Sequence, residues 1–273
     1  MHDRVSVDVE PHPADAKSSQ AGSAEAGIRI AGLSHNYWQQ GKPILAVKDI
    51  DLDIPAHTFV SIVGASGCGK TTLLDILSGL VTPQSGLVTV GGESPQAGRK
   101  DCARMFARDA LLPWRTAAKN IDFALATRLA DRAQRAERIG ELLKAVGLDG
   151  FQNAYPRQLS QGMRQRVALA RSFALRSEFV FLDEPFGALD ALTKVALQDL
   201  LLKLWEEIRS TVVLVTHDLA EAVALSDRVI VMSSRPGTIV ADIDIDLRRP
   251  RDVKALQSVA RFHELVAELW GRL

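Results

Sequence analysis

The sequence predicts an α/β fold built on a mainly parallel sheet. Three short segments, at residues 58–63, 179–182 and 211–215, are mostly apolar and rich in Val, Ile and Phe, which is typical of strands buried on both faces. A helical pattern over roughly 193–209 separates the second segment from the third. A strand, a helix and a strand in this order predict a right-handed parallel crossover.

The first apolar segment is followed by a helical pattern at 71–78, which ends at Gly79. A further strand is expected at 228–232. Residues from about 104 to 175 are largely helical in pattern, because apolar residues recur there between charged ones. The region therefore predicts a helical subdomain.

Both ends of the chain differ from the middle. Residues 1–27 are rich in Ser, Ala, Asp, Glu and Pro without periodicity, so we expect a disordered tail and an ordered chain from Ile28. At the other end, apolar residues recur at helical spacing and predict an amphipathic helix within 251–273.

Composition excludes some classes of function. The chain has 273 residues, of which 47% are hydrophobic, enough for the core of one large domain or two unequal lobes. Its formal net charge is zero. Nucleic-acid binders draw much of their affinity from a basic surplus, so we expect no nucleic-acid partner.

Cysteine usage and hydropathy indicate the compartment. Two cysteines, Cys68 and Cys102, make no disulfide framework, which favours a reducing cytoplasm. Acidic residues and prolines interrupt any apolar core near the start, so no signal peptide is expected. No stretch approaches the roughly 18 apolar residues of a membrane span. Any link to a membrane is therefore expected to run through a partner.

A glycine-rich loop follows the first predicted strand and matches the pattern G-x-x-x-x-G-K-T. Such a loop turns its backbone N–H groups toward phosphate oxygens, and the helix behind it adds a positive end. We expect Lys70 to reach the β- and γ-phosphates of ATP or GTP, Thr71 to ligate Mg²⁺, and Thr72 to contact the α-phosphate. The loop consists of Gly64, Ala65, Ser66, Gly67, Cys68, Gly69, Lys70 and Thr71.

Two carboxylates end the second predicted strand. Ligands of open α/β sheets bind at the carboxyl ends of strands, where Asp183 and Glu184 lie. Asp183 is expected to hold Mg²⁺, directly or through water, and Glu184 to polarise the attacking water as a general base. Together with the glycine-rich loop they indicate a P-loop ATPase.

A third motif reduces the number of P-loop ATPase families that the sequence fits. Residues 159–166, Leu-Ser-Gln-Gly-Met-Arg-Gln-Arg, resemble the signature motif of the ATP-binding-cassette (ABC) family, whose usual form is LSGGQ. Gln161 and Met163 depart from that form, while Ser160 and Gly162 remain. The resemblance covers about residues 28–250. It implies a P-loop ATPase core, an antiparallel β portion near the N-terminus and a helical subdomain. It also implies that Ser160, Gln161 and Gly162 contact a γ-phosphate.

The resemblance assigns three further residues. Tyr37 matches the aromatic residue that stacks on adenine, and Asp190 lies in the loop that joins two subunits. His217 matches the histidine that contacts the γ-phosphate. The catalytic residues implied by the family are therefore Glu184, His217 and Lys70.

The resemblance also implies partners. In the family, two subunits pair head to tail and sandwich ATP between the phosphate loop of one and the signature motif of the other. Here that predicts a homodimer with Lys70 and Ser160 of opposite chains around each ATP. A multi-span membrane permease and a periplasmic solute-binding protein would complete the complex, with this subunit peripheral on the cytoplasmic face of the inner membrane.

Three local features suggest the transported solute. The run Leu111-Leu112-Pro113-Trp114, Met163 in the signature motif, and the late Arg249-Pro250-Arg251-Asp252 are similar to the nitrate, sulfonate and taurine importer ATPases. The expected solute is a small anion of this kind, or another solute of a related importer. The alternatives are a soluble ABC protein of translation or repair and a regulatory module without turnover.

One position departs from the family. Members usually carry a glutamine that contacts Mg²⁺ and the attacking water, whereas Ala107 stands there in this sequence. Alanine can neither ligate a metal nor orient water. We therefore expect a weakened coupling between nucleotide and membrane partner, or an ordered water in place of the amide.

Overall fold

The computed structural model describes residues 26–107, 109–187 and 189–273. Within them, the larger sheet has the strand order β5-β6-β7-β3-β8-β9 and is parallel except for β9. Its strands are β3 (Phe59–Gly64), β5 (Cys102–Met105), β6 (Phe179–Asp183), β7 (Thr211–Val215), β8 (Arg228–Met232) and β9 (Ile239–Asp244). Strands β3, β6 and β7 are buried at every position, as their apolar sequences predict.

A second, antiparallel sheet forms near the N-terminus in the order β2-β1-β4. Its strands are β1 (Ile28–Gln39), β2 (Lys42–Ile54) and β4 (Ser85–Val90). Helix α1 (Lys70–Leu77) shares a hydrophobic core with both sheets. The predicted α/β fold with its antiparallel portion is confirmed.

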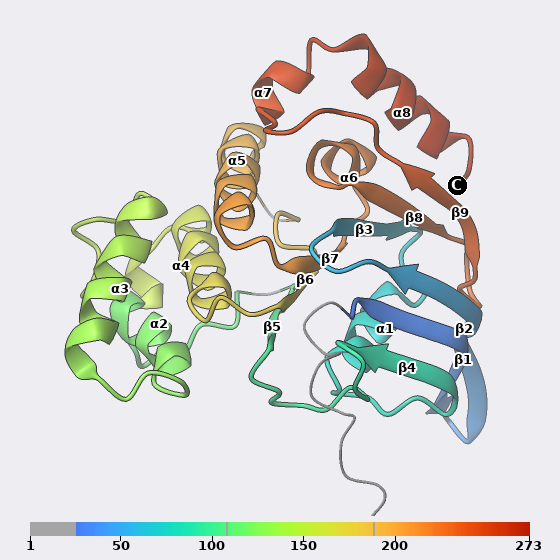
Figure 1. The fold of residues 1–273 in the computed structure, drawn as a ribbon, viewed down its shortest axis with the longest axis horizontal. Helices are drawn as coiled ribbons and strands as arrows, with labels where there is room; N and C mark the ends of the chain where they lie inside the picture. The colour runs from blue at the N-terminus through green and yellow to red at the C-terminus, as the bar shows by residue number, and fades with distance from the viewer. Residues whose placement is uncertain (1–25, 108, 188) are drawn as a thin grey trace, which may run out of the picture.

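The region from 104 to 175 holds the end of β5 and then a helical lobe, which extends away from the sheets in Figure 1. Each α-helix of the lobe is preceded by a polar residue whose side chain accepts a hydrogen bond from a backbone N–H of the first turn. These caps are Thr116, Asp131 and Ser160. The elements are α2 (Ala117–Leu125), α3 (Arg132–Ala145), the 3₁₀ turn η1 (Pro156–Gln158) and α4 (Gln161–Phe173).

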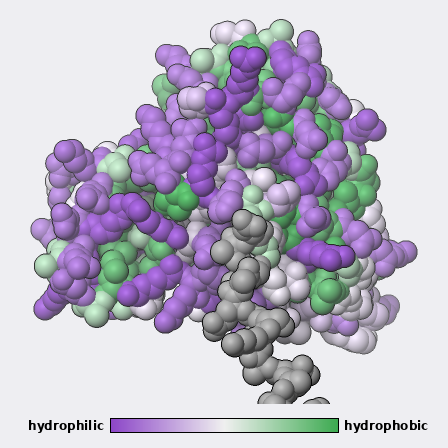
Figure 2. All heavy atoms as spheres, in the orientation of Figure 1, coloured by the Kyte–Doolittle hydropathy of each residue, from purple (hydrophilic) through white to green (hydrophobic). Residues whose placement is uncertain are grey.

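Helices α5 (Ala191–Ile208) and α6 (Leu219–Leu225) follow β6 and β7 and pack in the second hydrophobic core. They too start at aspartate caps, Asp190 and Asp218. None of the helices in the described ranges combines the length and apolar character that a membrane span requires. Figure 2 shows polar and charged side chains over most of the visible face, with hydrophobic ones in separate patches.

The C-terminal segment corrects one expectation. The single amphipathic helix expected within 251–273 is two helices, α7 (Val253–Leu256) and α8 (Ala260–Trp270). The break has a packing reason, because α7 contacts α5 and α6 whereas α8 lies along α6. The expected tail at residues 1–27 lies outside the described residues except for Ala26 and Gly27, and its disorder stays a prediction.

The arginines before α7 secure this segment. Arg251 is buried and donates to the carbonyl of Ser226 at 2.7 Å and of Leu247 at 2.8 Å. Burial lowers its pKa to about 10, which leaves the guanidinium charged at neutral pH. Arg249 pairs with Asp227 at 2.7 Å. The run 249–252 therefore has a structural role at the C-terminal end of α6.

Candidate functional site

Three neighbouring parallel strands end at one edge of the larger sheet. The glycine-rich loop follows β3, Glu184 follows β6, and His217 lies two residues beyond the end of β7. Since β6, β7 and β3 are adjacent and parallel, their carboxyl ends meet at this edge. The sheet topology thus brings together residues that lie far apart in the sequence.

The loop Gly64–Thr71 passes directly into α1, which starts at Lys70. Gly69 has a φ of 100°, and a Cβ there would lie 2.6 Å from Cγ1 of Val47. Only glycine fits this turn. The Lys70 ammonium donates to the carbonyl oxygens of Gly64 at 2.7 Å and Ala65 at 3.1 Å. A cation and the positive end of a helix therefore lie within one anion-binding loop.

A cavity of about 190 Å³ lies over this loop. Tyr37 and Glu184 line it beside the loop, although they lie far apart in the sequence. Of the predicted loop residues, Gly64, Ala65 and Cys68 are not among its lining, and the Cys68 side chain is buried. The lining residues are Tyr37, Ala46, Ser66, Gly67, Gly69, Lys70, Thr71, Thr72, Glu184 and Arg235.

Two predicted metal ligands face one another at the floor of the site. The Thr71 hydroxyl donates to Oδ1 of Asp183 at 3.3 Å. Burial raises the pKa of the Asp183 carboxyl, an effect that Arg104 and Thr71 reduce. No three His, Cys, Asp or Glu residues form a metal cluster in the described part of the chain. A hydroxyl and a carboxylate nevertheless fit Mg²⁺, which commonly takes its other ligands from substrate phosphates and water.

The candidate general base is held beside the candidate γ-phosphate contact. Oε2 of Glu184 lies 3.4 Å from Nδ1 of His217. Glu184 has a left-handed backbone, with a φ of 43°, and its N–H donates to the carbonyl of Val215 at 2.9 Å. Such strained residues concentrate at functional sites, where the surroundings hold them in place. Their arrangement can therefore orient a water molecule for attack.

The signature motif lies elsewhere in the chain. Ser160 is exposed, and its hydroxyl accepts from the Met163 N–H at 3.3 Å as the cap of α4. Asp190 is likewise exposed at the start of α5. The described residues that line the cavity do not include Ser160, Gln161, Gly162 or Asp190. One chain by itself thus brings together only part of the predicted site, and the roles of these four residues stay predictions.

Two arginines of the site were not anticipated from the sequence. Arg104, on β5, places Nη2 3.5 Å from Oδ2 of Asp183 and Nη1 2.6 Å from Asp75. Arg235 follows β8, lines the cavity and donates to the carbonyl of Gly67 at 3.3 Å. Neither lies in a motif with a known spacing, so no local signal marks them. Ala107 is exposed in the loop after β5.

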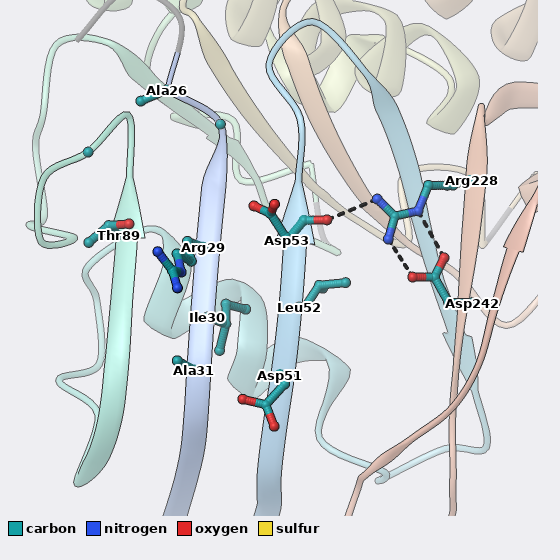
Figure 3. A pocket seen from close by; sticks show the side chains of 12 residues that line it. Ala26, Arg29, Ile30, Ala31, Asp51, Leu52, Asp53, Thr89, Arg228 and Asp242 are labelled. Carbon is teal, nitrogen blue, oxygen red and sulfur yellow. Dashed lines mark hydrogen bonds and ion pairs between the residues drawn. The ribbon is translucent and has the colours of Figure 1, made fainter. Parts of the chain in front are cut away.

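A larger hollow of about 910 Å³ lies at the opposite ends of the strands, lined by Arg29, Asp51 and Arg228 among others (Figure 3). Arg228 is the first residue of β8, whereas the glycine-rich loop adjoins the last. Its guanidinium is used within the chain, because it pairs with Asp242 and donates to the carbonyl of Asp53 at 2.9 Å. We assign no ligand to this hollow.

Comparison with known proteins agrees with this geometry. The sequence profile of the ABC transporter family matches residues 47–187, which span the glycine-rich loop, the signature motif and Glu184. The chain belongs to the ABC transporter family. It is an ATP-hydrolysing cassette of that family, as the loop, the acidic strand end and the signature motif predict.

Three relatives indicate the branch of this ABC cassette. An uncharacterised ABC transporter ATP-binding protein of Methanocaldococcus jannaschii is 43% identical over 230 residues, which cover 84% of this chain and 86% of that protein. The taurine import ATP-binding protein of Rhizobium johnstonii is 39% identical, covering 84% and 89% of the two chains. The nitrate import ATP-binding protein of Synechococcus elongatus is 41% identical, covering 83% and 84%. The cassette thus belongs with ATP-binding subunits of importers.

Solved structures of ABC cassettes resemble most of this chain. A dimeric bacterial ABC transporter cassette has a TM-score of 0.73 and 32% identity, covering 81% of this chain and 100% of that one. A dimeric post-hydrolysis state of an ATP-binding cassette, bound to ADP and Pi, has a TM-score of 0.72 and 31% identity with the same coverage.

Proposed function

We propose that this ABC cassette is the ATPase subunit of a bacterial importer for a small anion such as an aliphatic sulfonate, taurine or nitrate. The hydrolytic part rests on one observation: Glu184 and His217 lie 3.4 Å apart, and Glu184 lines the cavity over the phosphate loop. The choice of solute rests on the relatives, two of which are named for taurine and nitrate import.

Each residue of the site has its own role in the proposed reaction. The backbone of the phosphate loop and Lys70 bind the β- and γ-phosphates, and Tyr37 stacks on the adenine. Glu184 takes a proton from the attacking water while His217 contacts the γ-phosphate. Thr71 and Asp183 would hold Mg²⁺, which when bound offsets charge on the phosphate oxygens.

The site is proposed to be complete only in a dimer. Ser160, Gln161 and Gly162 lie outside the cavity of their own chain, and Ser160 is exposed at the positive end of α4. A second copy, placed head to tail, would present these residues to the γ-phosphate and Asp190 to the facing subunit. ATP would then join the two chains, and hydrolysis would release them.

The remaining partners follow from the importer class. A multi-span permease would receive the cassette on the cytoplasmic face of the inner membrane, and a periplasmic solute-binding protein would deliver the solute. The exposed Trp114, just before α2, and Phe123, on α2, support a surface for another protein.

Uptake by cells that lack the gene tests this proposal. We expect loss of uptake of labelled taurine, an alkanesulfonate or nitrate, restored by the wild-type gene and not by the Glu184→Gln variant. Affinity purification of the tagged cassette from membranes should also retain a multi-span protein. Unchanged uptake of all three anions, or a cassette recovered without any multi-span protein, would contradict the importer assignment.

A further inference from the structure

The loop 233–238 contributes one residue, Arg235, to the lining of the cavity over the phosphate loop, and no motif of the sequence predicts this loop. It follows β8, whose last residue, Met232, pairs with Gly64 at the start of the phosphate loop. The Ser233 hydroxyl donates to the carbonyl of Pro236 at 3.2 Å and accepts from the Thr238 N–H at 3.0 Å. These bonds hold the loop in one shape against the phosphate loop.

Backbone contacts tie this loop to two sides of the cavity. The Gly237 N–H donates to the carbonyl of Ala46 at 3.0 Å, and the Gly237 carbonyl accepts from Lys48 N–H at 2.9 Å. A Cβ at Gly237 would lie 1.9 Å from the carbonyl oxygen of Cys68, so only glycine allows this approach. The loop therefore contacts both the phosphate loop and β2, which carries the cavity residue Ala46.

Arg235 is the charged residue that this loop presents. Its Nε donates to the carbonyl of Gly67 at 3.3 Å, and its side chain lines the same cavity as Tyr37 and Lys70. Among the described residues, no carboxylate forms an ion pair with Arg235. A guanidinium has five donors, so most remain available for a ligand in the cavity.

We propose that Arg235 is a second cation of the nucleotide site, which binds the polyphosphate of ATP together with Lys70. A guanidinium binds phosphate oxygens through paired, charge-assisted hydrogen bonds, and the bond to Gly67 orients it for that contact. Arg235 then links the position of the phosphate loop to the charge of the bound nucleotide. This inference rests on the nucleotide site proposed above.

Nucleotide affinities of the full-length protein test the inference. We would compare dissociation constants of ATP, ADP and AMP for wild type, Arg235→Gln and Arg235→Lys by calorimetry. We expect Arg235→Gln to weaken ATP and ADP about tenfold and AMP less than threefold, because AMP lacks the terminal phosphates. The affinities of Arg235→Lys should fall between those of wild type and of Arg235→Gln. Lysine keeps the positive charge but lacks the paired N–H donors of a guanidinium. The salt dependence of ATP binding should also decrease in Arg235→Gln.

Arg248→Gln is the matched control, because Arg248 is exposed and does not line the cavity. It should leave all three affinities unchanged. An ATP affinity of Arg235→Gln within twofold of wild type, or an equal weakening of AMP and ATP, would overturn the phosphate role. Failure of the wild type to bind ATP would instead contradict the nucleotide site itself. If Arg235→Gln does not fold, the same criteria apply to Arg235→Lys.

Discussion

The guanidinium of Arg104 lies 3.5 Å from the buried carboxylate of Asp183, measured from Nη2 to Oδ2. The same guanidinium pairs with Asp75 of α1 at 2.6 Å, so one side chain joins β5, β6 and α1. The Cζ atom of the guanidinium lies over the ring of Phe106, 5.0 Å from the ring centroid. Phe106 is the residue before Ala107. Arg104 therefore connects the candidate metal-binding aspartate to the strand that leads into the helical lobe.

Replacing Arg104 by methionine should destabilise the protein by about 3 kcal/mol, because two carboxylates would lose their buried cation. Urea unfolding without nucleotide measures this. The double variant Arg104→Met/Asp183→Asn should lose less stability than the sum of the losses in the two single variants. Arg138→Gln removes an exposed pair with Glu141 and should change the stability by less than about 1 kcal/mol. Additive losses in the double variant would show that the Arg104–Asp183 contact contributes nothing.

Replacing Glu184 by glutamine should lower ATP turnover by about 100-fold or more while leaving ATP binding nearly unchanged, because an amide cannot accept the water proton. Phosphate release at saturating ATP measures turnover. The control is Glu178→Gln, an exposed carboxylate just before β6. Turnover of Glu184→Gln equal to that of wild type would remove Glu184 from the reaction.

Replacing Ala107 by glutamine should raise ATP turnover or tighten its coupling to uptake, because it restores the amide that family members usually carry. Ala107 is exposed, which leaves room for the longer side chain. Hydrolysis and solute uptake in reconstituted membranes are the two readouts. Ala107→Met, which adds similar bulk without a polar group, should change neither. If Ala107→Gln also changes neither, the hypothesis is wrong.

Asp218 should make the stability depend on pH. Burial alone would raise its pKa, but hydrogen bonds from Lys194 and the Glu221 N–H outweigh burial and lower the pKa below the ordinary value of 3.8. A lowered pKa means stabilisation that is present above 3.8 and is lost as the pH falls through the folded-state pKa. Asp218→Asn keeps the cap of α6 but removes the charge.

We therefore expect Asp218→Asn to lose about 1 kcal/mol at neutral pH, since partial exposure of the carboxylate lets solvent screen the pair. The difference from wild type should shrink as the pH falls below 3.8, and urea unfolding across that range measures it. Asp246→Asn, whose carboxylate pairs with Arg261 at the surface, should change stability less. A difference that stays constant down to the lowest pH would show that the charge of Asp218 is not the cause.

Local patterns predicted where the candidate reacting residues lie relative to the strands. The phosphate loop, Asp183 and Glu184 each adjoin an apolar strand, and a strand buried on both faces is visible in sequence as an unbroken apolar run. The C-terminal helix was harder, because the apolar spacing of α7 and α8 is nearly continuous across their break. α7 contacts α5 as well as α6, whereas α8 lies along α6, and the apolar spacing does not reveal this difference in packing.

The sequence by itself predicted the candidate phosphate loop, the carboxylates that follow the strand, and the family to which the chain belongs. These are properties of short segments, where the residue types and their spacing suffice. Tertiary structure alone decided that β7 lies between β6 and β3, which brings His217 to Glu184. It also decided that Arg104 meets Asp183 and that Arg235 meets Gly67. Such contacts depend on strand order and loop approach, which arise from the packing of the whole chain.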